Sequence, residues 1–260
     1  MNIQQYYHKT AASSLNGSLL ALIPAVTLNI YIVLHTLPIY FTFLTIPFFI
    51  YSLTSYQIYR LHNRRAFHID NSMISEKTAT SLYQEQQLLI AFLPAPSLRL
   101  LLFSPDGTMA GEIKDQNQSL FRWLLPTAFD RIKKGKYGIY NEKGTLLASI
   151  IISKKELRIE LTDGRKISVL EKEKQFRCVT YDVESNNRIL HKSPMFADIR
   201  ISDEKGTDYL QIKTGWMPLE WGKRFPNPNT PVLTFLLSLT DEEKAILFGI
   251  LAKQYAYSDY

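Results

Sequence analysis

The residues best suited to chemistry form a basic cluster of four cations within six residues: Arg131, Lys133, Lys134 and Lys136. Such a cluster suits phosphates or the anionic cytoplasmic leaflet of a membrane, where each basic side chain contributes about 1 kcal/mol near the surface. The alternative is a solvated turn, because surface lysines are common and Asp130 and Glu142 dilute the charge. We predict a lipid-binding or phosphate-binding site here. Lys154, Lys155 and Arg158 would join it only if the fold brings the two segments together.

A second candidate contact surface lies in the segment 215–225, where three aromatic residues flank turn residues: Trp216, Trp221 and Phe225. Clustered aromatic side chains mark contact surfaces when they are exposed. The alternative is a packing role, in which the rings close one end of the fold. Exposure distinguishes the two.

The sequence carries no catalytic or metal-binding signature. Its five histidines and Cys178 lack the spacing of metal ligands. A Gly-Lys-Ser/Thr phosphate loop, a Gly-x-Gly-x-x-Gly fingerprint and a Gly-x-Ser-x-Gly elbow are all missing from it. Cys178 falls in an alternating strand pattern, where a small buried thiol is the usual explanation. We expect no enzyme activity, no metal and no cofactor, and the single cysteine suits a reducing compartment.

These candidate sites follow a long uncharged stretch. Residues 10–59 contain no Lys, Arg, Asp or Glu, and one helical pass needs roughly 20 apolar residues. The stretch predicts a transmembrane hairpin over residues 15–59, with passes at 15–34 and 39–58. A cleaved signal peptide fits poorly because the apolar run is too long and a second one follows. Two buried helices of a soluble protein are the remaining alternative.

The flanking charges predict the orientation of this hairpin. Arg60, Arg64 and Arg65 follow the second pass and Lys9 precedes the first, whereas the connecting turn has no Lys or Arg. Basic residues stay on the cytoplasmic side. Both termini and the soluble domain should therefore face the cytosol. The sequon at residues 117–119 would argue for the opposite orientation if it were used.

The rest of the chain has the composition of one soluble domain. We divide the sequence into an N-terminal cytosolic segment (1–14), the hairpin, a basic juxtamembrane segment and linker (60–87) ending in a short helix from 81, and the domain (88–260). After residue 65, 26 basic and 24 acidic residues leave a net charge of only +2. This near balance argues against a nucleic-acid partner.

The domain has the pattern of an antiparallel β protein. Short alternating segments separated by Asp-Gly, Lys-Gly and Asn-Asn turns recur every 8–12 residues or so, which is typical of a sandwich or barrel. The predicted strands are 88–93, 98–103, 108–113, 137–140, 145–153, 156–161, 166–171, 175–182, 188–192, 196–202 and 208–213.

A helix should end the domain. Thr240 and Glu243 form a capping box, in which each reaches the backbone amide of the other. Residues 245–252 have no polar side chain, so this helix must be buried on all sides, and it is too short to span a membrane. The fold class we expect is mainly β behind a transmembrane α-hairpin, with an antiparallel β-barrel around a buried hydrophobic C-terminal helix.

Two segments resemble the tubby-like superfamily, which includes the tubby, LURP-one-related and phospholipid-scramblase-like domains. They are the strand hairpin KYGIYNEKGTLLA (136–148) and the helix start LSLTDEEKAILFG (237–249). The resemblance would cover residues 88–260 and implies a roughly twelve-stranded barrel around a hydrophobic C-terminal helix. The N-terminal hairpin departs from the scramblase-like pattern, in which the hydrophobic segment is C-terminal.

We therefore expect an integral membrane protein of the cell membrane whose cytosolic domain binds a lipid head group or a membrane-associated protein. A scaffold that the hairpin only localises is the first alternative. A scramblase-like lipid-handling protein is the second, although the passes offer few polar groups for a lipid pathway.

Overall fold

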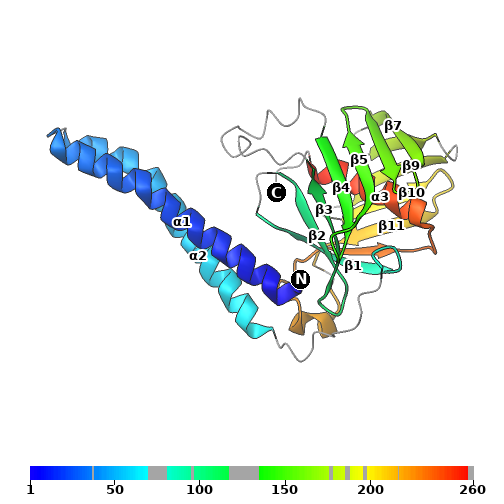
Figure 1. Cartoon of the computed structure of the whole chain (residues 1–260), viewed down its shortest axis with the longest axis horizontal. Coiled ribbons are helices and arrows are strands. Elements are labelled where there is room, and N and C mark those ends of the chain that lie inside the picture. The colour runs from blue at the N-terminus through cyan, green and yellow to red at the C-terminus, as the bar shows by residue number, and fades with distance from the viewer. Residues whose placement is uncertain are drawn as a thin grey trace. The chain divides into compact units, whose positions relative to one another are not determined.

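The computed structural model describes residues 1–36, 38–69, 81–94, 97–116, 135–175, 178–184, 188–195, 198–215 and 217–256 (Figure 1). Its contacts divide the chain into two compact units. One is Ile3–Asn71, and the other is Ser72–Tyr260 together with Met1–Asn2. The first contains a pair of helices, and the second contains an antiparallel sheet and a C-terminal helix.

The helical unit consists of α1 (Ile3–Leu34), the 3-10 helix η1 (Ile39–Thr45) and α2 (Ile46–His68). The predicted helical pair is confirmed, and both helices continue past the passes expected from the sequence. At 1.5 Å per residue α1 extends about 48 Å, whereas the hydrocarbon core of a bilayer is about 30 Å thick.

The two helices meet along a seam of mostly small residues spaced seven or fourteen apart. They are Ala11, Ser18, Ala25 and Ile32 on α1, Thr45 at the end of η1, and Ser52 and Ala66 on α2. A seven-residue period keeps one face of each helix on its neighbour, and small residues let helices approach closely within a membrane. The hydroxyls of Ser18 and Ser52 share a hydrogen bond of 3.0 Å, which sets the register of the pair.

Large apolar side chains cover the outer surface of the pair. Leu20, Val33, Phe43 and Leu53 are all exposed. Both helical segments are long and apolar enough to cross a membrane, and only 17% of each apolar window is buried. A core helix of a soluble protein would be mostly buried, so this exposure argues against the soluble alternative. The pair is weak evidence for a membrane anchor.

The second unit is built on one large antiparallel sheet. Each strand pairs with the strand before and the strand after it in sequence, and β1 pairs with β12 as well as with β2. Glycines in several predicted turns adopt positive φ, as at Gly144 (78°) and Gly164 (86°). The strands are β1 (Gln87–Phe92), β2 (Arg99–Phe103), β3 (Met109–Asp115), β4 (Gly135–Asn141), β5 (Leu146–Ile152), β6 (Glu156–Leu161), β7 (Lys166–Gln175), β8 (Cys178–Val183), β9 (Arg188–Met195), β10 (Asp198–Asp203), β11 (Asp208–Lys213) and β12 (Val232–Phe235).

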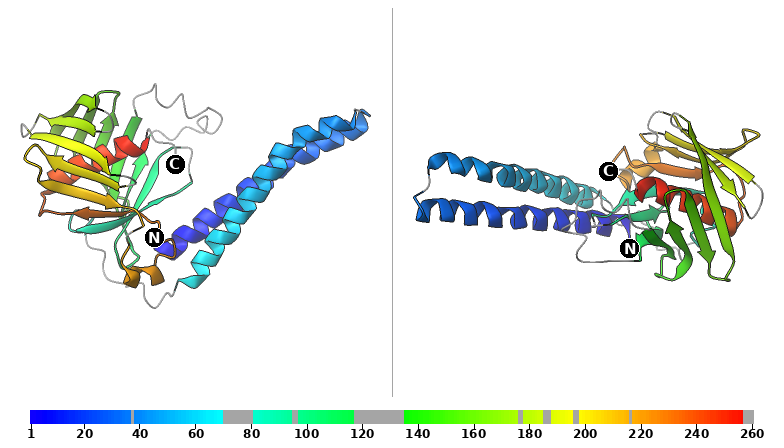
Figure 2. Two further views of the ribbon diagram at one scale, coloured as in Figure 1. Left: turned by 180° about the vertical axis from the view of Figure 1, so that it is seen from behind. Right: turned by 90° about the horizontal axis from the view of Figure 1, so that it is seen from above.

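The C-terminal helix α3 (Asp241–Ala256) lies inside the curve of the sheet, as both views in Figure 2 show. Its capping box is confirmed. The amide of Glu243 donates to the Thr240 hydroxyl at 3.3 Å, and the amide of Thr240 donates to the Glu243 carboxylate at 2.9 Å. All residues from Lys244 to Lys253 are buried, and the apolar ones join the strand side chains in one core.

Two lysines at the ends of this buried stretch were not anticipated. The ammonium of Lys244 donates to the carbonyls of Tyr83 and Glu85 at 2.5 and 3.0 Å, and burial lowers the pKa of Lys244. Lys253 lies 2.7 Å from a carboxylate oxygen of Glu171. Both positions fit the rule that a buried charge needs a partner. The long aliphatic stems pack in the core while the charged ends reach polar groups.

One local prediction was wrong, and one strand was missed. No short helix forms at 81–87: residues 82–84 form a turn, β1 begins at Gln87, and Leu82 is fully buried in the core of the sheet unit. Strand β12 was not among the predicted strands, and its burial does not alternate, since three of its four residues are buried. The sequon at 117–119 lies outside the described residues. The antiparallel, sheet-rich fold with a C-terminal helix is confirmed.

Strand β2 is buried on both faces, so Leu100, Leu101, Leu102 and Phe103 are all inaccessible. Half of these side chains point away from α3, because neighbours along a strand alternate between faces. Phe225 covers part of this outer surface, with its ring edge-on to Phe103 at 6.4 Å between centroids.

Candidate anion-binding edge of the sheet

Only part of the predicted basic cluster lies in the described chain. Lys136 is the second residue of β4 and its side chain is exposed. Arg131, Lys133 and Lys134 lie outside the described residues, so their place in the site stays a prediction. In sequence they come directly before Gly135, where β4 begins.

Strand pairing brings Lys154 and Lys155 to the same edge as Lys136. Gly135 pairs with Ile152, and Lys136 pairs with Ile151. The amide of Ser153 donates to the carbonyl of Glu156 at 2.8 Å, which closes the turn between β5 and β6. The two lysines occupy this turn, next to the start of β4, since adjacent strands lie about 4.8 Å apart. We call Lys136, Lys154 and Lys155 the lysine edge.

The same pairing places Arg158 near this edge but leaves it neutralised. Ile151 lies between Lys136 and Arg158 across three strands, and all three side chains share the outer face. The guanidinium of Arg158 is hydrogen-bonded to Glu156, and this contact raises the pKa of Arg158. Its charge is already matched. Lys154 and Lys155 therefore join the predicted site, whereas Arg158 does not.

The lysine edge carries positive charge that no described carboxylate balances. Within the described ranges, no carboxylate oxygen lies within 4 Å of the ammonium groups of Lys136, Lys154 or Lys155. Glu156, which directly follows Lys155, is paired with Arg158, and two acids further along the sheet also have other partners. Glu171 pairs with Lys253, and Asp182 pairs with Lys172 at 2.6 Å.

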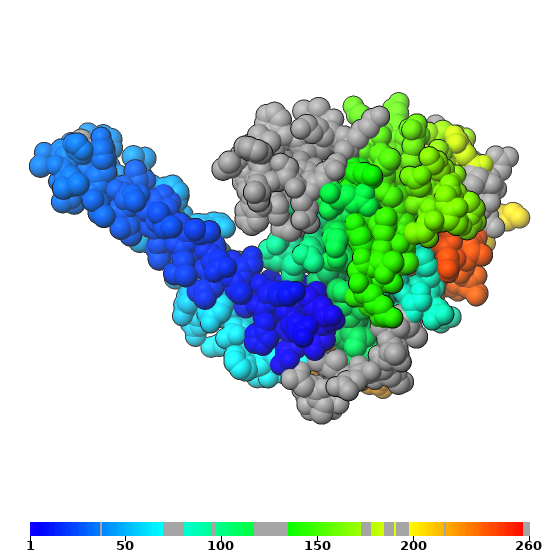
Figure 3. All heavy atoms as spheres, in the orientation of Figure 1, coloured from blue at the N-terminus to red at the C-terminus, as the bar shows by residue number. Residues whose placement is uncertain are grey.

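This arrangement suits recognition of an anion more than catalysis. Ammonium groups act as point charges toward phosphate, and side chains of β4 and β5 lie on the face shown in green in Figure 3. In the part of the chain that the structure describes, no group of three or more His, Cys, Asp or Glu residues is placed to hold a metal ion. Cys178 is free and half-buried at the start of β8.

The aromatic residues of the segment 215–225 differ in their exposure to solvent. Phe225 is 1% exposed and packs against the sheet, which favours the packing alternative at this position. Trp221 is half-buried in the 3-10 helix η5 (Leu219–Lys223). Trp216 lies outside the described residues.

The most exposed side chain described in this segment was not among the predicted contact residues. Leu219 is 96% exposed at the start of η5. The guanidinium of Arg224 donates to the carbonyl of Pro105 at 2.8 Å, which ties the end of the segment to the turn between β2 and β3. No local pattern in residues 215–225 singles out Leu219 as exposed.

The basic residues that flank the second pass lie at one end of the helical pair. Arg60 and Arg64 are exposed on α2, and Arg65 is half-buried. The two helices run antiparallel and Ser18 lies opposite Ser52. Nine residues before Ser18 is Lys9, and nine residues after Ser52 is Leu61, so Lys9 lies level with Leu61, beside Arg60. The connection between α1 and η1 has no Lys or Arg in its sequence.

Comparison of this chain with protein-family models, with curated proteins and with solved structures found no match.

Proposed function

We propose that this protein is a membrane-anchored binding module whose sheet unit recognises anionic lipid head groups at the cytoplasmic face of the cell membrane. The lysine edge is the observation that carries the proposal, because it concentrates unbalanced positive charge where two strand segments meet. Each such lysine near an anionic surface contributes about 1 kcal/mol. The residues implied by sequence, Arg131, Lys133 and Lys134, would extend the same edge.

The proposal includes a membrane-spanning hairpin with both ends in the cytosol. Its support is the exposed apolar surface of α1 and α2 and the grouping of Lys9, Arg60, Arg64 and Arg65 at one end. Lipid would cover the side chains that the helices leave exposed.

We also propose that the sheet is a tubby-like β-barrel enclosing α3. Two observations support it: β1 pairs with both β2 and β12, and ten successive residues of α3 are buried. A fold alone does not define an activity, so the lipid-binding proposal depends on the lysine edge and not on this resemblance.

A membrane-bound protein partner is the second candidate function. Leu219 favours it, because a partner that covered this 96% exposed apolar side chain would remove apolar area from water. In that case the hairpin would only localise the sheet unit, which would act as a scaffold.

Vesicle capture by the full chain tests the lipid-binding proposal. The chain is first inserted into nanodiscs of neutral phosphatidylcholine, so that only the part outside the disc can recognise a second membrane. Co-sedimentation is then measured with vesicles of phosphatidylcholine alone or mixed with phosphatidylserine. We expect capture of the anionic vesicles only, and loss of that capture at raised salt.

Two charge-matched variants complete the test. Lys136→Glu, Lys154→Glu and Lys155→Glu together should weaken capture by about 100-fold or more, at about 1 kcal/mol per lysine. Lys143→Glu, Lys166→Glu and Lys205→Glu change the same charge at exposed positions in or beside turns at the opposite ends of the strands and should retain capture. Equal capture by both variants would contradict a role for the lysine edge. No capture by the unmodified chain would favour the protein partner.

A further inference from the structure

The end of α2 presents a face that is both basic and apolar. Six exposed residues repeat at intervals of three, four and seven, which places them on one side of the helix: Gln57, Arg60, Leu61, Arg64, Phe67 and His68. This side is opposite the seam residues Ser52 and Ala66. We call it the outer face of α2.

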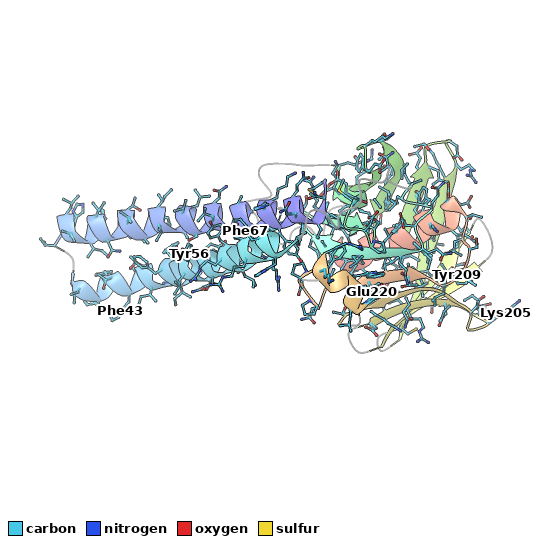
Figure 4. The ribbon with its side chains drawn as sticks, turned by 90° about the horizontal axis from the view of Figure 1, so that it is seen from below. Phe43, Tyr56, Phe67, Lys205, Tyr209 and Glu220 are labelled. Carbon is cyan, nitrogen blue, oxygen red and sulfur yellow. The ribbon has the colours of Figure 1, made fainter. Side chains whose placement is uncertain are left out.

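Phe67 is the most unexpected member of this face. It is 75% exposed although it lies nine residues beyond the predicted end of the second pass. The ring of Phe67 contacts the ring of His8 on α1 edge-on, at 6.1 Å between centroids. This contact leaves most of the Phe67 side chain exposed. Figure 4 labels Phe67 together with Tyr56 and Phe43 along the helical pair.

The outer face continues the apolar stripe that lipid would contact in the membrane. Ile46, Phe49, Ile50 and Leu53 precede Gln57 at the same helical spacing and are exposed. A single surface therefore runs along α2 from apolar residues into residues that combine apolar rings with guanidinium groups.

Charge favours lipid head groups over a protein as the occupant of this face. Residues 1–69 contain no Asp or Glu, and no described carboxylate lies within 4 Å of Arg60 or Arg64. Guanidinium groups bind phosphates through paired hydrogen bonds. Helices that lie at this depth of the membrane combine Lys or Arg with Trp, Phe or Leu.

The length of the pair makes this contact geometrically feasible. Phe67 lies about 13.5 Å along the helix from Ile58, whereas the head-group layer adds only about 7 Å to each side of the hydrocarbon core. A tilt of about 35° from the bilayer normal lies within the usual range of 0–40°. It brings the outer face of α2 closer to the bilayer, to the edge of the head-group layer. Tilting also accommodates a helix that is longer than the bilayer is thick.

We propose that the helical pair crosses the membrane at a tilt, with the outer face of α2 lying in the cytoplasmic head-group layer and binding anionic lipids through Arg60 and Arg64. This proposal rests on membrane insertion of the hairpin, but it is independent of the lysine edge. It assigns a second lipid contact to the chain, outside the sheet unit.

Spin-label depth measurements on the full chain test the tilt. Single nitroxide labels are placed at Phe67→Cys, Gln5→Cys and Ile23→Cys, each with Cys178→Ser, in nanodiscs of phosphatidylcholine and phosphatidylserine. Gln5 is level with Arg65 in the register set by Ser18 and Ser52, but it is exposed on α1. Accessibility to oxygen and to a water-soluble nickel chelate then reports the depth of each label.

We expect the label at Phe67 to be several-fold less accessible to the nickel chelate than the label at Gln5, with Ile23 in the hydrocarbon core. Arg60→Gln with Arg64→Gln should raise the nickel accessibility at Phe67 toward that of Gln5. If the labels at Phe67 and Gln5 were equally and fully accessible to the nickel chelate while the label at Ile23 lay in the hydrocarbon core, the tilt would be overturned but membrane insertion would not. An aqueous Ile23 label would instead overturn membrane insertion and this proposal with it.

Discussion

The seam between α1 and α2 holds mostly Ala, Ser and Thr, while Leu, Ile and Phe face outward. The sheet unit has the opposite arrangement, with Leu, Ile, Val and Phe around α3 and charged residues outside. Burial of apolar area drives folding only against water. In lipid, close packing and hydrogen bonds hold helices together. This contrast is what a helical pair in lipid and a sheet unit in water would show.

Replacing one Phe by Ala in each unit should give the largest difference in the stability of the sheet unit. Phe248 is fully buried in α3, with its ring edge-on to Phe235 at 5.7 Å. Phe248→Ala should lower the free energy of unfolding of the sheet unit by about 3–5 kcal/mol, because it removes apolar burial and leaves a cavity. Urea unfolding of the full chain in nanodiscs, followed by tryptophan fluorescence, measures this loss.

Phe43→Ala is the matched control, since Phe43 is exposed on η1. In the membrane one Phe contributes only about 0.3–0.6 kcal/mol to insertion, so the unfolding of the sheet unit should not change. A loss at Phe43 as large as that at Phe248 would contradict the division into two differently solvated units.

The outer surface of the sheet should respond to acid through Glu112. Burial opposes ionisation of Glu112, but hydrogen bonds and ion pairs with Lys114 and Arg99 hold the pKa of Glu112 below its ordinary value of 4.5. A carboxyl group with a lowered pKa in the folded state stabilises the fold above its ordinary pKa. That stabilisation is lost as the pH falls through the lowered pKa.

Glu112→Gln should therefore reduce stability by about 1 kcal/mol at neutral pH, a value discounted because Arg99 is one-third exposed. The difference between the two proteins should vanish below the folded-state pKa of Glu112. Urea midpoints measured from neutral to acid pH give the comparison. A constant difference across this range would show that the ion pairs do not account for the effect.

The smallest effect should come from the hydrogen bond in the helical seam. Ser18→Ala should weaken the pairing of α1 and α2 by about 0.6 kcal/mol, the average for such bonds in membranes. The register between α1 and α2 is easier to measure than this small change in pairing energy. With Cys178→Ser, Ser18→Cys and Ser52→Cys should form a disulfide readily under mild oxidation, since the two hydroxyl oxygens lie 3.0 Å apart.

Leu20→Cys with Leu53→Cys is the control pair, because both side chains face outward. Efficient cross-linking of that pair, with none at Ser18 and Ser52, would mean that a different face of each helix forms the seam.

Much of this architecture was predictable because its signals are local. Fifty uncharged residues define the helical pair, Thr240 and Glu243 define the start of α3, and Gly144 and Gly164 define turns. The lysine edge could also have been derived. A turn centred near residue 143 implies that residues 136 and 151 pair, which places the next turn beside the start of β4.

Other features depend on contacts between distant segments and leave no local pattern. Lys244 appears as a surface residue in sequence, but the carbonyls of Tyr83 and Glu85 provide its partners from 159 to 161 residues away. Burial of both faces of β2 needs Phe225 from a distant loop. The exposure of Leu219 depends on how η5 is held, which sequence spacing does not reveal.

The most direct test of the account is the topology of the full chain in intact cells. With Cys178→Ser, single cysteines are introduced at Thr36, in the turn after α1, and at Lys205, which Figure 4 shows at the tip of the turn between β10 and β11. A membrane-impermeant thiol reagent should label Thr36→Cys in intact cells and Lys205→Cys only after permeabilisation. Labelling of Lys205→Cys in intact cells, or protection of Thr36→Cys from the reagent, would contradict a two-pass anchor that holds the sheet unit in the cytosol.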